Sequence, residues 1–207
     1  MRRYLESPDP ELKCEADTLR GVLAVTGGKG GTGKTTTTLG LAAAYARQRR
    51  RPTAVDGDRD MPNLAITADA AGLTGIDVVA NRDGRPIDDV LPTRPRGPVL
   101  VDCPAGAGPD AVDPLRRADS AILVTTHDRE SIEDALKTAE LARAVGTRIA
   151  GLAVTRHGTV PDGLPDTLDT DHAVAIPPVE HPLTHPDATA AYDHLAAALQ
   201  PHRSPRK

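Results

Sequence analysis

The chain has 207 residues, a formal net charge of −4 at pH 7, and three tyrosines but no phenylalanine or tryptophan. This length suits one domain with a sizeable core, and the nearly balanced charge excludes a strong overall attraction to nucleic acid or to an anionic membrane. The two cysteines, Cys14 and Cys103, match neither a disulfide framework nor the spacing of a paired-cysteine metal site.

Both ends of the chain are polar. Residues 1–20 lack the apolar segment of a secretory signal, and no run of 18 apolar residues occurs that could span a bilayer. We therefore expect a cytoplasmic protein. Residues 1–20 are predicted to form an N-terminal arm, residues 21–200 a single domain, and residues 201–207 a disordered basic tail.

Short apolar runs recur along the domain, and each is continuous rather than alternating, as in strands that are covered on both faces. The runs begin at Gly21, Thr53, Pro98, Ala121, Ile149 and Ala173. Helical patterns are found at residues 34–50, 109–117, 131–145 and 187–199. Strands that alternate with helices predict an α/β fold, in which helices cover both faces of a mostly parallel sheet.

Local signals refine two of these segments. The sequence "SIED", from Ser131 to Asp134, fits a capping box at the start of a helix, and Gly146 is well placed to end that helix. The segment 157–172 is rich in proline, glycine and aspartate, so we expect it to be a surface loop.

A glycine-rich segment follows the first predicted strand and precedes the first predicted helix. "GKGGTGKT", Gly28 to Thr35, fits the pattern G-x-x-x-x-G-K-[ST] of a phosphate-binding loop, or P-loop. The backbone N–H groups of such a loop converge on phosphate oxygens, and the helix that follows adds the positive end of its dipole. The predicted phosphate contacts are Gly28, Gly30, Gly31, Thr32, Gly33, Lys34, Thr35 and Thr36.

Three motifs in order resemble the MinD/ParA family of ATPases. Lys29, immediately before Gly30, makes the loop similar to that family's deviant P-loop. "VDGDRDMPNL", residues 55–64, is similar to the family's first switch, and "VLVDCPAG", residues 99–106, is similar to its second switch. The resemblance implies a P-loop NTPase fold, with ATP and Mg²⁺ as cofactors.

The resemblance also implies roles for individual residues. Lys34 would reach the β and γ phosphates, and Asp58 would position the attacking water. Thr35, Asp58 and Asp102 would hold Mg²⁺. Lys29 would cross a face-to-face dimer to the partner's phosphates, like an arginine finger. A surface lysine near the phosphates of its own subunit remains an alternative for Lys29.

Other residues are assigned less sharply. Asp56 either shapes the first switch or joins the outer shell of the metal. Thr155 and Arg156 stand where the family often has Asn-Arg, and "AIPP" resembles an adenine strap that includes Pro177. We therefore expect Thr155, Arg156 and Pro177 to contact the base.

The function implied by the resemblance is an ATP-dependent homodimeric switch that hydrolyses ATP slowly and places division, partition or other cellular machinery through an unidentified protein partner. Two alternatives remain open: a nucleotide-gated scaffold with little hydrolysis, and an ATP-dependent small-molecule enzyme, for which the short segments between the motifs leave little room. Arg47–Arg51 leaves non-specific DNA open as a partner, although these arginines also suit the end of a helix. Direct membrane anchoring is disfavoured because no large apolar residue follows residue 199.

Overall fold

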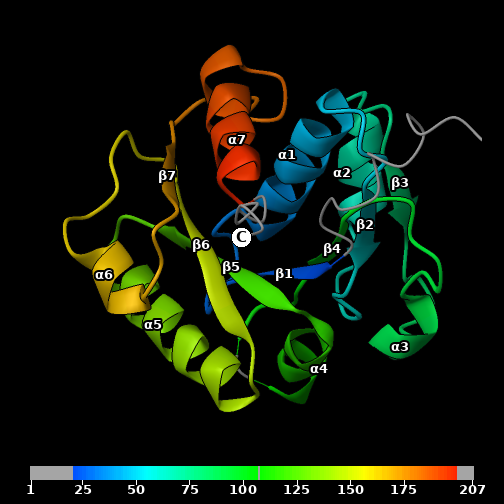
Figure 1. Ribbon diagram of the computed structural model, residues 1–207, viewed down its shortest axis with the longest axis horizontal. Coiled ribbons are helices and arrows are strands. Elements are labelled where there is room, and N and C mark those ends of the chain that lie inside the picture. The colour runs from blue at the N-terminus through cyan, green and yellow to red at the C-terminus, as the bar shows by residue number, and fades with distance from the viewer. Residues whose placement is uncertain (1–20, 107, 200–207) are drawn as a thin grey trace, which may run out of the picture.

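The computed structural model describes residues 21–106 and 108–199 (Figure 1). The predicted N-terminal arm and basic tail lie outside the described residues. The strands are β1 (Val22–Thr26), β2 (Thr53–Asp56), β3 (Asp77–Val79), β4 (Val99–Asp102), β5 (Ser120–Thr126), β6 (Arg148–Thr155) and β7 (Ala173–Ile176). The helices are α1 (Lys34–Arg47), α2 (Leu64–Ala70), α3 (Ile87–Val90), α4 (Pro109–Arg117), α5 (Arg129–Ala144), α6 (Leu164–Leu168) and α7 (Pro186–Ala198).

The seven strands form one sheet in the order β3-β2-β4-β1-β5-β6-β7, and every neighbouring pair is parallel. This arrangement confirms the predicted α/β fold, and all six predicted apolar runs are strands of the sheet. In the register of β4, Asp102 lies beside Val25 of β1 and Asp56 of β2. The loops that follow these three strands therefore leave the same edge of the sheet side by side.

Helices cover both sides of the sheet (Figure 1). On one side, the buried side chains of α1, α2 and α7 form a cluster that includes Leu39, Leu64 and Tyr192. On the other side, those of α4, α5 and α6 form a cluster that includes Leu115 and Leu168. Burial on both faces explains why the strands are continuous apolar runs. No helix among residues 21–106 and 108–199 is both long enough and apolar enough to cross a bilayer.

The first helix is shorter than predicted. α1 ends at Arg47 rather than at residue 50, and Arg49 and Arg51 have left-handed backbone conformations with φ of 61° and 47°. Pro52 follows directly, and a proline disfavours helical conformation in the residue before it. The arginines after Arg47 form the turn that leads into β2, so most of the basic run follows the helix and is not part of its last turn.

The capping box predicted at Ser131 was wrong. α5 begins two residues earlier, and the Oδ1 atom of its N-cap Asp128 accepts a hydrogen bond from the Ser131 backbone N–H at 3.0 Å. The Ser131 hydroxyl instead accepts from the Thr126 N–H at 3.0 Å, which ties the helix to the end of β5. Gly146, with φ of 88°, follows the end of α5 as predicted.

Four short elements were not predicted. The stretch between the two switches holds α2, β3 and α3, and the segment 157–172, which was predicted to be a loop, contains α6. Leu164 and Leu168 lie one turn apart on α6 and are buried against the sheet. That spacing is a helical signal, but five residues are too few to show a period.

The packing of α1 against α7 depends on a residue without a side chain. A Cβ atom added at Gly40 would overlap the ring of Tyr192, which is buried. We predict that Gly40→Ala lowers the free energy of unfolding by about 1–3 kcal/mol, although alanine favours helix, because the overlap displaces the ring. Urea denaturation followed by circular dichroism measures this.

Gly158→Ala is the matched control, because a Cβ atom at Gly158 meets nothing within 4 Å. It should change the free energy of unfolding by less than about 0.5 kcal/mol. Equal stability of the Gly40 and Gly158 variants would show that Tyr192 does not depend on close contact with α1.

Candidate nucleotide-binding site

The glycine-rich loop lies between β1 and α1, as the pattern predicts. Gly33 immediately precedes α1 and has φ of 92°, a conformation that strains any residue with a side chain. A Cβ atom at Gly28 would overlap the backbone carbonyl of Asp134 on α5. The glycines at these two positions are therefore required by the path of the loop, which leaves its backbone open to a ligand.

The side chain of Lys34 folds back onto this loop. It is the first residue of α1, its side chain is buried, and its Nζ atom donates a hydrogen bond to the Lys29 carbonyl at 3.2 Å. Burial lowers the pKa of Lys34, and the nearby Asp102 carboxylate opposes this effect. The loop thus holds an ammonium group whose partner is a backbone carbonyl, and anionic phosphate oxygens would be stronger acceptors.

Asp102 ends β4 directly beside the start of α1. Its Oδ2 atom accepts a hydrogen bond from the Thr35 hydroxyl at 2.6 Å, and its Oδ1 atom accepts one from the Thr38 hydroxyl at 3.3 Å. The side chain is buried, and this burial raises the pKa of Asp102 to about 7, although both hydroxyls and Lys34 lower it. A buried carboxylate with so little compensation is a group that a cation would stabilise.

The donor set at this point suits magnesium. The Thr35 hydroxyl and the Asp102 carboxylate are hard oxygen donors in contact with each other, and Mg²⁺ typically combines one or two such groups with water and substrate phosphates. Two protein oxygens leave most of the coordination of Mg²⁺ to water and phosphate, so this pair fits a metal that binds together with a nucleotide.

The first-switch loop is organised by Asp56. Its Oδ1 atom accepts a hydrogen bond from the Asp58 N–H at 3.2 Å, and its Oδ2 atom accepts one from the Leu64 N–H at 3.0 Å. Of the two roles considered for Asp56, shaping the loop is the one seen here. Asp58 in turn accepts hydrogen bonds from the N–H groups of Asp60 and Met61 through its Oδ1 atom, at 3.1 and 3.0 Å.

Asp58 lies close enough to Lys34 to favour the charged form of the lysine, so it is one of the groups that raise the pKa of Lys34. The structure thus brings the first switch to the P-loop. The assignment of Asp58 to the metal and to the attacking water stays a prediction.

Lys29 has a partner within its own chain. Its Nζ atom forms an ion pair at 2.6 Å with the Oε2 atom of Glu130, in the first turn of α5, and both side chains are solvent-exposed. This contact raises the pKa of Lys29. Glu130 was not among the predicted site residues, because a glutamate in the first turn of a helix is common and gives no signal by itself.

The predicted base contacts lie against the P-loop. The Thr155 hydroxyl donates a hydrogen bond to the Thr32 carbonyl at 2.6 Å, and Arg156 Nη2 donates one to the Gly31 carbonyl at 2.6 Å. A hollow of about 320 Å³ opens beside them. Its lining is Gly31, Gly33, Thr36, Thr155, Arg156, Ile176, Pro177, Val179, Glu180, Pro182 and Tyr192. The structure thus brings Thr155, Arg156 and Pro177 together, and Val179, Glu180 and Pro182 extend the set that was predicted.

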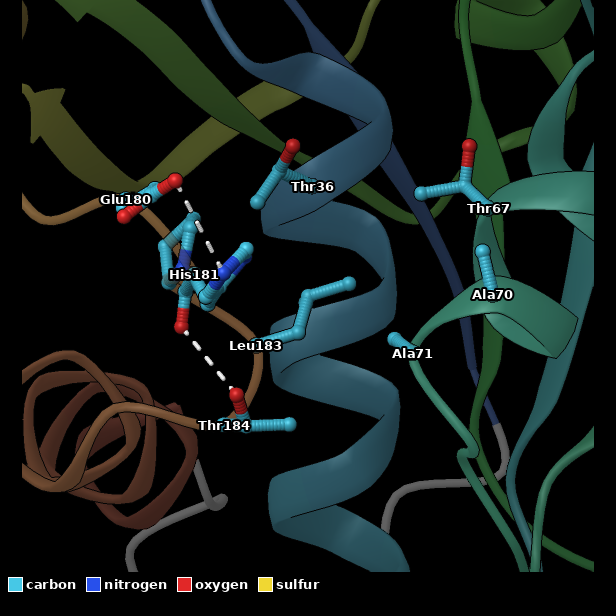
Figure 2. A pocket seen from close by; sticks show the side chains of 9 residues that line it. Thr36, Thr67, Ala70, Ala71, Glu180, His181, Leu183 and Thr184 are labelled. Carbon is cyan, nitrogen blue, oxygen red and sulfur yellow. Dashed lines mark hydrogen bonds and ion pairs between the residues drawn. The ribbon is translucent and has the colours of Figure 1, made fainter.

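A second hollow, of about 450 Å³, lies on the other side of Thr36, between α1, α2 and the segment before α7 (Figure 2). Residues 180–184 form one wall, and Thr67 and Ala70 of α2, with Ala71 directly after it, form the opposite wall. Figure 2 shows Leu183 extended across the face of α1. The two hollows share Thr36, Glu180 and Pro182, so the segment before α7 borders both of them.

The raised pKa of Asp102 predicts how stability depends on pH. The folded state keeps the Asp102 proton up to a pH of about 7, whereas the unfolded chain, with its ordinary pKa of 3.8, loses it earlier. The carboxyl therefore reduces stability progressively as the pH rises from about 4 to about 7. We predict that Asp102→Asn raises the free energy of unfolding by about 1–3 kcal/mol at about pH 7.5, and by less at about pH 5.

Urea denaturation of the nucleotide-free protein in a metal chelator measures this effect. Asp69→Asn is the control, because Asp69 lies exposed on α2 and its neutralisation should change stability by less than about 0.5 kcal/mol. Destabilisation by Asp102→Asn at both pH values would show that the fold needs the charged carboxylate.

Comparisons with known proteins agree with this geometry. Residues 23–170 match the model of the CobQ/CobB/MinD/ParA nucleotide binding domain. An uncharacterized ATP-binding protein of Methanocaldococcus jannaschii is 30% identical over 169 residues, which cover 65% of this chain and 63% of that protein. The septum site-determining protein MinD of Synechocystis is 30% identical over 175 residues, which cover 65% of this chain and 64% of that protein. The chain thus spans less than two thirds of the length of these relatives.

The fold is also found among solved structures. MinD of Pyrococcus horikoshii, solved as a complex with Mg-ADP, superposes with a TM-score of 0.73 at 24% identity, over 85% of this chain and 94% of that chain. At this identity the likeness shows the fold. Together with the family match over most of the domain, it leads to one conclusion: the chain belongs to the CobQ/CobB/MinD/ParA family of P-loop nucleotide-binding proteins.

Proposed function

We propose that this protein is an ATP-dependent switch: it binds ATP with Mg²⁺, pairs face to face with a second copy of itself, and hydrolyses ATP slowly. Its output would be the placement of division, partition or similar machinery through a protein partner. That partner, and a contact with non-specific DNA through the arginines near Arg49, stay predictions from the sequence.

One observation carries the nucleotide part of the proposal. Lys34 and Thr35, at the start of α1, meet Asp102, at the end of β4, at one edge of the sheet, where a P-loop would place the β and γ phosphates and their metal. The Mg-ADP complex of the P. horikoshii MinD supports the same ligand here.

The chemistry would consist of positioning and charge stabilisation. Backbone N–H groups of the loop would hold the phosphates, and Lys34 would neutralise the charge that develops on them. Thr35 and Asp102 would hold Mg²⁺, which offsets phosphate charge when bound. Asp58, on the loop organised by Asp56, would orient the attacking water.

Lys29 links this chemistry to pairing. In the single chain its ammonium is engaged by Glu130 at the surface, and exposed ion pairs of this kind contribute little to stability. The side chain is therefore free to exchange Glu130 for a phosphate of a second copy that faces the loop. Such a charge supplied in trans can raise hydrolysis by about 10³- to 10⁵-fold.

A small-molecule ATP-dependent enzyme stays an alternative because of the second hollow. The short segments between the motifs were expected to leave little room for an acceptor, yet about 450 Å³ lies beside Thr36. An ATP turnover number that rises when a metabolite is added would favour this alternative. A turnover number, per protein molecule, that rises with protein concentration would favour the dimeric switch.

The first test concerns pairing. If Asp58 orients the attacking water, Asp58→Ala should trap the ATP-bound state, so light scattering should give twice the monomer mass in Mg-ATP and the monomer mass in Mg-ADP. Lys34→Ala, which should lose nucleotide affinity, is the control and should be a monomer in both. A monomeric Asp58→Ala protein that demonstrably binds ATP would contradict the dimeric switch and favour the alternatives.

The second test concerns Lys29. We predict that Lys29→Ala binds a fluorescent ATP analogue with an affinity within about threefold of the wild type, yet hydrolyses ATP slower by on the order of 10³-fold or more. Lys137→Ala is the matched control, because Lys137 also forms an exposed ion pair on α5, with Asp134 at 2.9 Å. Turnover by Lys29→Ala that equals the control would show that no lysine acts in trans.

A further inference from the structure

The loop of the first switch is held to a distant helix by one arginine. Arg59 directly follows Asp58, and its guanidinium reaches two carboxylates of α4: Nη1 lies 3.0 Å from Asp110 Oδ1, and Nη2 lies 3.4 Å from Asp113 Oδ2. The two aspartates are three residues apart, so they project from the same face of the helix. The planar guanidinium fits this pair in a way that a lysine could not.

This contact is better sheltered than the other ion pairs of the described surface. The Arg59 side chain is 26% exposed, whereas the arginine of the Arg47–Asp193 pair is 43% exposed. Within the described residues, the remaining hydrogen bonds of loop 57–63 run to near neighbours in the sequence, apart from that of Gly57 N–H to the Asp102 carbonyl at 2.9 Å. Among the described residues, Arg59 therefore makes the long-range side-chain hydrogen bonds of this loop.

The helix at the other end of the contact follows the second switch. α4 begins at Pro109, shortly after the segment 99–106, so the bridge joins the loops that leave β2 and β4. A polar hollow of about 300 Å³, lined in part by Asp88, Asp113 and Arg117, separates α4 from α3. Arg117 forms an ion pair with Asp88 across it. The ion pairs of Arg59 and Arg117 thus join α4 to the first-switch loop and to α3.

The side chains of Asp58 and Arg59 interact with different parts of the molecule. Asp58 interacts electrostatically with Lys34 of the P-loop, whereas Arg59 extends toward α4. Fixing the guanidinium therefore limits how far the neighbouring carboxylate can move relative to the bound phosphates. A displacement of about 1 Å in a positioned group can reduce a rate by about 100-fold.

We propose that Arg59 is a positioning residue, which ties the loop that carries Asp58 to α4 so that the two switch segments move as one unit. The proposal about catalysis rests on the proposed ATPase function; the tie between loop and helix does not. Since the charges are partly exposed, their loss should hardly change global stability.

Hydrogen exchange measured by mass spectrometry tests the tie directly, in the absence of nucleotide. The double variant Asp110→Asn/Asp113→Asn keeps the loop sequence intact, so intrinsic exchange rates of residues 57–63 are unchanged. We expect the amides of this loop to exchange at least fivefold faster than in the wild type. Arg47→Gln, which breaks an exposed arginine ion pair between α1 and α7, is the matched control and should leave the loop unchanged.

Kinetics then tests the positioning role. Arg59→Gln should lower kcat by about tenfold, with KM for ATP within about twofold and an unchanged melting temperature. Arg59→Lys should recover only part of kcat, because an ammonium cannot bridge both carboxylates. The charge exchange Arg59→Asp/Asp110→Arg should restore kcat further than either single change allows.

The outcomes separate the two hypotheses. Loop exchange in Asp110→Asn/Asp113→Asn equal to that of Arg47→Gln would overturn the tie, whatever the activity. Faster loop exchange with an unchanged kcat for Arg59→Gln would overturn the positioning role. If the wild-type protein hydrolyses no ATP, the proposed ATPase function fails, and the exchange measurement still decides whether Arg59 ties the loop to α4.

Discussion

The buried carboxylate of Asp102 is the contact on which the rest of the site depends. It accepts hydrogen bonds from Thr35 and Thr38 at the start of α1, and its backbone carbonyl accepts one from Gly57 at the start of the first-switch loop. One residue thus connects three segments that are far apart in sequence. A charge in this position is costly, since burial raises its pKa to about 7, and such costs are typical of functional sites.

The helices are held by apolar packing on one part of the molecule and by ion pairs on another. α1 and α7 pack through a continuous apolar cluster that includes Leu39, Tyr192 and Leu195. Around the first-switch loop, in contrast, α3, α4 and the loop meet through ion pairs beside a polar hollow. Packed apolar cores resist gradual deformation, whereas an exposed ion pair such as Arg117–Asp88 can exchange partners at little cost, so a conformational switch would move α4, and the loop tied to it, on the polar side.

The sequence predicted the parts of the site that depend on short-range geometry. The P-loop glycines, Lys34 and Thr35 lie on consecutive backbone, so their pattern is visible in a single segment. Contacts between segments were harder to predict. Thr38 lies one turn after Thr35, so both side chains are on the helix face toward Asp102. Nothing in the run of four threonines distinguishes these two from the others. Asp128 rather than Ser131 caps α5 because the Ser131 hydroxyl bonds to β5, a tertiary contact without a local signal.

Lys29 and Arg59 show how similar ion pairs can serve different ends. Lys29 has a single carboxylate partner, and both groups are exposed, so a phosphate can replace Glu130 at little cost. Arg59 has two partners on one helix face and its side chain is more sheltered, so both contacts must break before the loop can separate from α4. The first arrangement suits a group that changes partners when two copies meet. The second suits a group that keeps its place, so that the same event moves the loop and α4 together.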